Sequence, residues 1–153
     1  SDAAGVVGRV RTRVRVGGRP PVRNRSLTDC LDSWAVLCWL DGDEPAAARV
    51  EAAMTSRPVM SWINLGEVAY IVERRAGSGQ ARHVVRELRR RVTLDLPTDV
   101  RVLEAAHIKA RYAVAYADAF AVATAIAHGA MLLTGDPEIL DGDPRWPVED
   151  LRT

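Results

Sequence analysis

Four acidic residues stand at places in the sequence where a carboxylate can do chemistry. Asp32 follows the apolar pair Cys30-Leu31, and Asp136 follows the apolar run 130–134. Asp118 precedes a stretch of small and apolar residues, and Glu67 lies in "WINLGEVAYIV", where Asn64 is the only other strongly polar side chain. Because a buried carboxylate without a partner is costly, these acids need strong donors or a cation beside them.

The acids suit a hard divalent cation. Two carboxylates ~5 Å apart repel by about 3 kcal/mol at an effective dielectric constant near 20, so a cluster of four needs a counter-charge. Oxygen-only ligands are typical of Mg²⁺ or Mn²⁺, and such an ion can activate water for phosphodiester hydrolysis. No Cys/His cluster has zinc spacing. We therefore predict that the catalytic and metal-binding residues are Asp32, Glu67, Asp118 and Asp136.

Each acid also has an ordinary structural interpretation. Asp136-Pro137-Glu138 is a typical helix start, Asp118 would complement a helix dipole, and Asp32 would cap the next helix. Glu67 would pair with Arg74 or Arg75. These alternatives stay open for each residue alone. The metal site is favoured because one Glu and three Asp would meet at one edge of a sheet.

The elements that must position these acids follow from apolar runs and helix signals. We expect strands at 27–32, 58–61, 92–96, 130–134 and 146–151, and helices at 33–42, 43–56, 62–75, 80–91, 98–111 and 117–128. Strands that alternate with helices predict a parallel sheet covered by helices, with functional groups beyond the carboxyl ends of the strands. Ser33 is the expected N-cap of the first helix, and Asn64 and Glu67 would share one helix face.

Composition indicates one soluble globular domain with an N-terminal extension. The chain has 153 residues, of which 48% are hydrophobic and 27% charged, and no apolar run reaches the ~18 residues of a membrane span. Two cysteines and no secretory signal favour a cytoplasmic protein. Residues 1–26 hold seven arginines and one acid. We interpret 1–26 as a basic, flexible extension, either foreign to the native protein or a nucleic-acid-binding arm, and 27–153 as the functional domain.

A second basic segment spans residues 74–91, where Glu87 is the only acid. An acidic site repels a phosphodiester substrate, so basic surface elsewhere must offset that repulsion. We predict contacts to nucleic-acid phosphates from this segment, with a solvated helix face as the alternative. The candidate residues are Arg74, Arg75, Arg82, Arg86, Arg89 and Arg90.

Four segments together resemble the PIN-domain ribonucleases of the VapC toxin type. They are "LDSWAVLCWLDGDE" (31–44), "NLGEV" (64–68), "YADAFAVATAIAHGA" (116–130) and "LLTGDPEI" (132–139), in the family's order over roughly residues 28–150. The resemblance implies a three-layer α/β/α sandwich with a parallel central sheet. It also implies that the four acids bind Mg²⁺ or Mn²⁺. Thr134, Asn64 and Ser33 would support them.

The resemblance further implies an endoribonuclease toxin that cleaves tRNA or rRNA. Such a protein would form a homodimer, and a cognate antitoxin protein would neutralise it. Trp34 and Ala115 depart from the residues that many relatives carry at these positions.

Three other functions are compatible with parts of this pattern. A catalytically inactive PIN-like module that binds RNA or protein is the main alternative, and the intact acids argue against it. An aspartate-nucleophile phosphatase would carry D-x-D after the first strand, whereas this chain has Asp32-Ser33-Trp34. A phospho-accepting receiver would carry a lysine after a late strand, whereas Lys109 falls within a predicted helix.

Overall fold

A computed structural model describes residues 28–142 and 145–153, so the predicted extension 1–26 lies outside the described residues. The sheet has five strands in the order β3-β2-β1-β4-β5, and every neighbouring pair is parallel. The strands are β1 (Asp29–Leu31), β2 (Val59–Ser61), β3 (Thr93–Asp95), β4 (Met131–Thr134) and β5 (Val148–Asp150). All five predicted strands are present, each shorter than the range expected for it.

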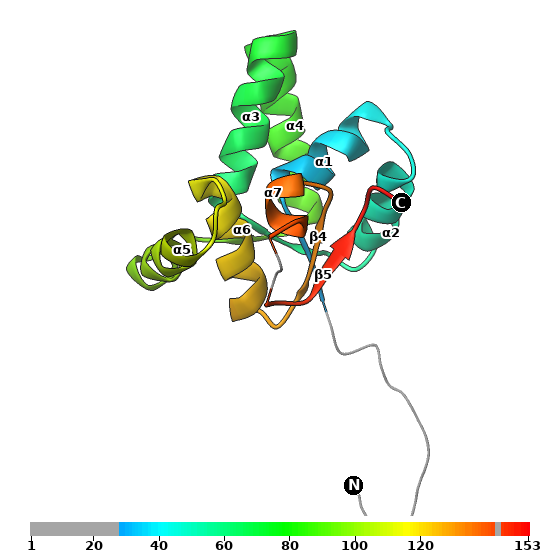
Figure 1. Cartoon of the computed structure of the whole chain (residues 1–153). Helices are drawn as coiled ribbons and strands as arrows, with labels where there is room; N and C mark the ends of the chain where they lie inside the picture. Colours follow the sequence, from blue (N-terminus) through cyan, green and yellow to red (C-terminus); the bar gives the residue numbers. More distant parts are fainter. Residues whose placement is uncertain (1–27, 143–144) are drawn as a thin grey trace, which may run out of the picture.

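Seven helices connect these strands in the described part of the chain (Figure 1). They are α1 (Ser33–Asp41), α2 (Ala46–Met54), α3 (Trp62–Ala76), α4 (Ser78–Arg91), α5 (Asp99–Arg111), α6 (Tyr116–Ala127) and α7 (Pro137–Leu140). None of the described helices is both long enough and apolar enough to cross a bilayer. The prediction that Ser33 caps α1 is wrong. Asp32 is the N-cap, because its side chain accepts a hydrogen bond from the amide of Ala35.

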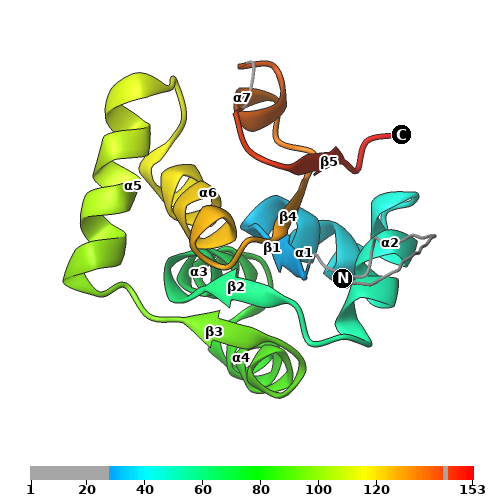
Figure 2. The same ribbon diagram turned by 90° about the horizontal axis from the view of Figure 1, so that it is seen from below.

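The helices cover both faces of the sheet, which confirms the predicted three-layer α/β/α architecture. One core packs helices α1 to α4 against the sheet, and the other packs α5, α6 and α7 against the opposite face. Figure 2 shows α5 and α6 on one side of β1 and β4, with α1 and α2 on the other. Cys30 and Leu132 face the α5–α6 layer, whereas Leu31 and Leu133 face the α1–α4 layer. Because both faces are covered, successive residues at the centre of these strands, Cys30-Leu31 and Leu132-Leu133, are apolar and buried on opposite faces.

The strand order places β1 beside β4 at the centre of the sheet. The chain proceeds outward from β1 to β2 and β3, and then returns to the other side of β1 as β4. The direction of winding therefore reverses between β1 and β4, and α/β sheets bind ligands in the crevice at such a reversal. Leu31 pairs with Leu133, so Asp32 and Thr134 emerge next to each other at the carboxyl ends.

One apolar face of the outer layer is not packed against the core. Val100, Leu103 and His107 recur at helical spacing, a pattern typical of a buried face, yet all three are exposed. Leu103 is 69% exposed, and Leu96 and Ile126 flank it with 63% and 50% exposed. Ala105 and Ile108 are instead the α5 residues whose side chains are buried in the core.

Candidate active site

Asp32 and Thr134 form the centre of the site, at the ends of β1 and β4. The Asp32 carboxylate is 1% exposed, and it accepts a hydrogen bond from the amide of Ala35 at 2.8 Å and another from Oγ1 of Thr134. The same Thr134 oxygen accepts a hydrogen bond from the amide of Asp136 at 3.0 Å. Thr134 therefore links the carboxylate that ends one strand to the loop that follows the next strand.

Helix α3 contributes Asn64 and Glu67 from one face, as the three-residue spacing predicts. Oε1 of Glu67 accepts a hydrogen bond from the Ser33 hydroxyl at the start of α1. Asn64 is fully buried, and its amide donates to the carbonyl of Ala117 at 3.0 Å, beside Asp118. Ser33 and Asn64 thus position the two helices that carry Glu67 and Asp118.

Of the ordinary structural roles considered for these acids, helix capping is present in the structure, and pairing with an arginine is not found among the described residues. Asp32 and Asp136 do cap α1 and α7, so capping and a place in the site occur together. The proposed pairing of Glu67 with Arg74 or Arg75 is wrong. Arg74 stacks over the Tyr70 ring at 5.0 Å, and Arg75 pairs with Asp41 at 3.4 Å.

Glu138 lies beside two of the predicted acids, although the sequence did not point to it. Carboxylate oxygens of Asp118, Asp136 and Glu138 all lie within 4.8 Å of one another. Oε1 of Glu138 also accepts a hydrogen bond from the amide of Ala115, the N-cap of α6, whose own side chain makes no capping bond. The available signal was the absence of a capping side chain at Ala115, which leaves the start of α6 in need of another acceptor.

Burial and mutual repulsion raise the pKa of two of these acids. Burial raises the pKa of Asp32 to about 7 against the hydrogen bonds from Thr134 and Ala35, and repulsion by Asp136 and Glu67 adds to that rise. Burial also raises the pKa of Asp118 to about 8, with further repulsion from Asp136, Asp32, Glu67 and Glu138. The four predicted acids therefore lie close enough to influence one another.

The donor set fits a hard divalent cation. Ligand oxygens around Mg²⁺ lie 2.0–2.1 Å from the ion, so opposite ligands are about 4 Å apart. The 4.8 Å limit among the oxygens of Asp118, Asp136 and Glu138 approaches this spacing. Within the described residues, no ion pair involves these three acids, Asp32 or Glu67. A cation of +2 charge would supply the missing counter-charge.

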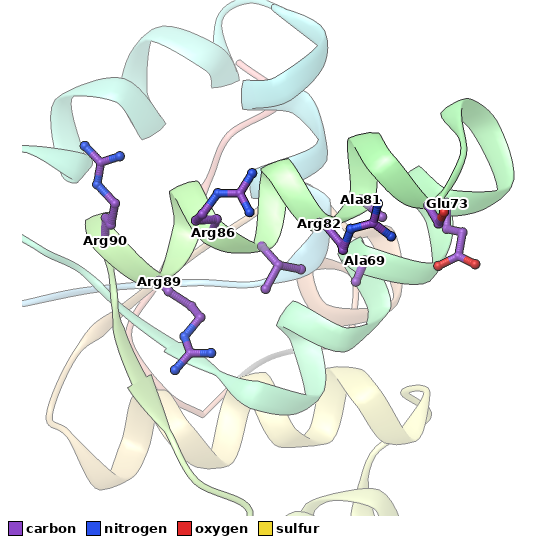
Figure 3. Close-up of a pocket in the computed structure, with 9 residues that line it drawn as sticks. Ala69, Glu73, Ala81, Arg82, Arg86, Arg89 and Arg90 are labelled. Atoms are coloured by element: carbon purple, nitrogen blue, oxygen red, sulfur yellow. The ribbon is translucent and has the colours of Figure 1, made fainter.

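Four of the six candidate RNA-binding arginines line one groove between α3 and α4. They are Arg82, Arg86, Arg89 and Arg90, and they follow one another along α4 opposite Ala69 and Glu73 of α3 (Figure 3). The groove has a volume of about 590 Å³. Arg74 and Arg75 do not line it. Successive residues of an α-helix are rotated by ~100° about the helix axis. Viewed along the axis of α3, the side chains of Ala69 and Glu73 are therefore rotated by ~200° and ~240° from that of Glu67. The groove therefore opens on the side of α3 that faces away from Glu67.

A comparison with models of known protein families gives one match. The family model "PIN domain" matches residues 30–143. No curated protein matches the sequence significantly. Among solved structures, the DNA-bound VapBC complex of Salmonella typhimurium is similar with a TM-score of 0.66 and 21% identity, over 82% of this chain and 98% of that chain.

Two further solved structures are similar to the chain. A toxin–antitoxin complex from Klebsiella pneumoniae has a TM-score of 0.58 and 19% identity, over 74% of this chain and 91% of the other. Mycobacterium tuberculosis VapC20, described as a sarcin–ricin loop cleaving toxin, has a TM-score of 0.59 and 17% identity, over 71% and 90%.

Proposed function

The chain belongs to the PIN domain family, and on that premise we propose that it is a divalent-metal-dependent endoribonuclease toxin of the VapC type. One observation carries the proposal. Carboxylate oxygens of Asp118, Asp136 and Glu138 lie within 4.8 Å of one another, Asp32 and Glu67 are close enough to repel Asp118, and no ion pair among the described residues neutralises these acids. A bound divalent cation would be the largest local charge in such a site and would relieve this repulsion.

We infer that Asp118, Asp136 and Glu138 hold the metal ion, with Asp32 and Glu67 as further ligands, direct or through water. When bound, Mg²⁺ or Mn²⁺ supplies Lewis acidity, which lowers the pKa of a water ligand and offsets charge on a phosphodiester. The raised pKa values of Asp32 and Asp118 mean that both carboxyls lose protons when the cation arrives.

The remaining residues of the site keep these acids in place. Thr134 and the amide of Ala35 direct both oxygens of Asp32, and Ser33 orients Glu67. Asn64 fixes the first turn of α6 through the Ala117 carbonyl. In this proposal the acids hold the ion and these donors fix the geometry of the acids.

RNA is the substrate that the basic groove supports. Within the described residues, Arg82 and Arg86 form no ion pair, and the Arg90 pair with Glu87 at 3.5 Å is solvent-exposed and hence weak. Arg89 lies over the Trp62 ring at 5.3 Å. Because the groove faces away from Glu67, we expect these arginines to contact RNA beyond the cleavage site.

An antitoxin protein is the second proposed partner. The support comes from the similar structures, which include VapBC and a toxin–antitoxin complex. Co-expression of the cognate antitoxin should abolish RNA cleavage by the purified complex. Undiminished cleavage by that complex would argue against this partner.

A second copy of this chain is the proposed occupant of the exposed apolar face made by Leu96, Val100, Leu103 and Ile126. Asp99 stands at one end of α5 and Arg111 at the other, so two antiparallel α5 helices would bring opposite charges together. Leu103→Glu should then shift the sedimentation coefficient from dimer to monomer, whereas Leu40→Glu on α1 should not. A monomeric native protein would exclude the pair.

The experiment that tests the proposed function is sequencing of RNA 5′ ends after mild expression. The native chain should create new ends at defined sites in tRNA or rRNA, and Glu67→Gln should not. Equal patterns of ends from both chains would favour an inactive PIN-like binding module instead.

A further inference from the structure

Trp34 lies against the loop that joins β4 to α7. Gly135, in the middle of that loop, is buried, and a Cβ atom there would overlap the six-membered ring of Trp34 at Cη2, Cζ2 and Cζ3. Other glycines of the described chain lack such a neighbour: a Cβ on Gly66 would meet nothing within 4 Å. The absence of a side chain at Gly135 is therefore what allows the indole to pack there.

The loop under Trp34 carries the functional groups of β4. Thr134 precedes Gly135 and bonds Asp32, and Asp136 follows it and belongs to the acid cluster. The carbonyl of Thr134 also accepts a hydrogen bond from the amide of Leu151 at 2.9 Å. Both ends of the loop are thus fixed by hydrogen bonds, since the Asp136 amide donates to Thr134 Oγ1 at 3.0 Å. Among the described residues, the Gly135 backbone between them forms no hydrogen bond and packs against the Trp34 ring.

Trp34 is itself held firmly enough to act as a support. It lies in the first turn of α1, two residues after Asp32, so its backbone is anchored by the same capping bond that orients that acid. Its side chain is half-buried and lines a cleft with Cys38, Pro45 and Leu151. The ring is therefore placed between the Gly135 loop and this second set of contacts.

We propose that Trp34 is a positioning residue of the metal site. Its indole packs on Gly135 and holds the Thr134–Asp136 loop so that the Asp136 carboxylate faces Asp118. The proposal rests on the proposed function, because it assumes that these acids bind Mg²⁺. It also gives a physical role to Trp34, which stands two positions after Asp32, where the resemblance leads us to expect a small or polar residue.

Fluorine NMR of the full chain labelled with 5-fluorotryptophan tests the contact. The four tryptophans give four resonances, and the resonance lost in Trp34→Phe belongs to Trp34. Titration of MgCl₂ into metal-free protein should shift the Trp34 resonance with the same midpoint as binding measured by calorimetry. The Trp39 resonance should stay in place, because Trp39 bonds Glu51 on the far side of α1.

A double-mutant cycle measures what the contact does for the metal. Gly135→Ala should weaken Mg²⁺ binding about 10-fold, a magnitude typical of residues that orient metal ligands. In the Trp34→Ala background the methyl group added by Gly135→Ala would not overlap an indole ring. Adding Gly135→Ala to that variant should therefore weaken Mg²⁺ binding little further. Gly66→Ala, which adds the same methyl group to open space, is the matched control. Trp34→Phe replaces Trp34→Ala in the cycle if the alanine variant does not fold.

Three outcomes are distinguishable. A shifting Trp34 resonance together with a background-dependent effect of Gly135→Ala supports the proposal. Normal Mg²⁺ binding by the native chain with an unmoved Trp34 resonance, or an equal effect of Gly135→Ala in both backgrounds, overturns it and leaves the nuclease proposal standing. A native chain that does not bind Mg²⁺ overturns the proposed function and this inference together.

Discussion

Thr134 donates a hydrogen bond from Oγ1 to Oδ2 of Asp32, across the central pair of parallel strands. The two residues are 102 positions apart in the chain, and both are buried. The same hydroxyl oxygen accepts from the Asp136 amide, so one side chain couples two acids of the site. The strand register of Leu31 against Leu133 makes this contact possible, because it brings the two carboxyl ends level.

Thr134→Val should weaken Mg²⁺ binding by about 10- to 100-fold, as expected when a residue that orients a metal ligand is lost. Valine keeps the shape and removes the donor, so the buried Asp32 carboxylate loses one of its two hydrogen bonds. Isothermal calorimetry with MgCl₂ measures the change. Thr134→Ser keeps the hydroxyl and should bind within a few-fold of the native protein. Equal affinity of the valine and native proteins would show that this bond does not position the metal ligands.

The metal-free protein should become less stable as the pH rises. The folded protein retains protons on Asp32 and Asp118 up to about pH 7 and 8, whereas both are lost near pH 4 on unfolding. Between these values the folded state binds more protons, so the free energy of unfolding falls with increasing pH. Thermal melts in EDTA should show a lower Tm at pH 8 than at pH 5, and Mg²⁺ should reduce that difference. A Tm in EDTA that rises over this range would contradict the assignment of raised pKa values.

Glu138→Gln separates the two roles of Glu138. The amide keeps an oxygen that can accept from Ala115, so the start of α6 and the Tm should change little. The loss of one negative charge beside Asp118 and Asp136 should nevertheless weaken Mn²⁺ binding, measured by electron paramagnetic resonance of the free ion. Glu138→Ala should weaken binding and also lower the Tm, since an unpaired N-cap costs about 1 kcal/mol. Unchanged Mn²⁺ affinity in Glu138→Gln would remove this residue from the site.

Replacement of Arg82 and Arg86 by glutamine should weaken RNA binding and its dependence on salt. Each phosphate contact to single-stranded RNA contributes about 0.7 to the slope of log K against log salt, so the double variant should lose about 1.4 from the slope. Filter binding measures RNA affinity as a function of salt concentration, with every variant made in the catalytically inactive Glu67→Gln chain so that the RNA is not cleaved. Arg74→Gln with Arg75→Gln removes the same charge outside the groove and is the matched control. Equal salt slopes for the two double variants would exclude the groove as the RNA site.

The residues differ in how far their role could be predicted from the sequence. Asp32 and Asp136 follow apolar runs, and parallel strands place such residues at one edge, so their meeting was predictable. Glu138 was not, because an acid in the first turn of a helix satisfies the helix dipole and needs no further reason. Its contact with Ala115 depends on how α7 packs near α6, which no local pattern encodes.

Packing between distant segments also sets what a local sequence pattern can predict. Leu103 has the spacing of a core residue, and periodicity gives the apolar side of a helix without saying what covers it. The contact of Trp34 with Gly135 joins segments about 100 positions apart, so neither residue signals the other. The predicted strands were too long by residues such as Pro58 and Leu151, which still bond the neighbouring strand although the regular ladder has ended: Pro58 accepts from Thr93 and Leu151 donates to Thr134.

The most direct measurement is cleavage of RNA by purified native protein and by Asp118→Asn, each with Mn²⁺ and with EDTA, alongside Mn²⁺ binding to both. We expect the native protein to bind Mn²⁺ and to cleave only when it is present. Asp118→Asn should fold with an unchanged or higher Tm, bind Mn²⁺ weakly and leave the RNA intact. Cleavage by the native protein in EDTA, or by Asp118→Asn at the native rate, would contradict a nuclease that depends on a cation held at the ends of β1 and β4.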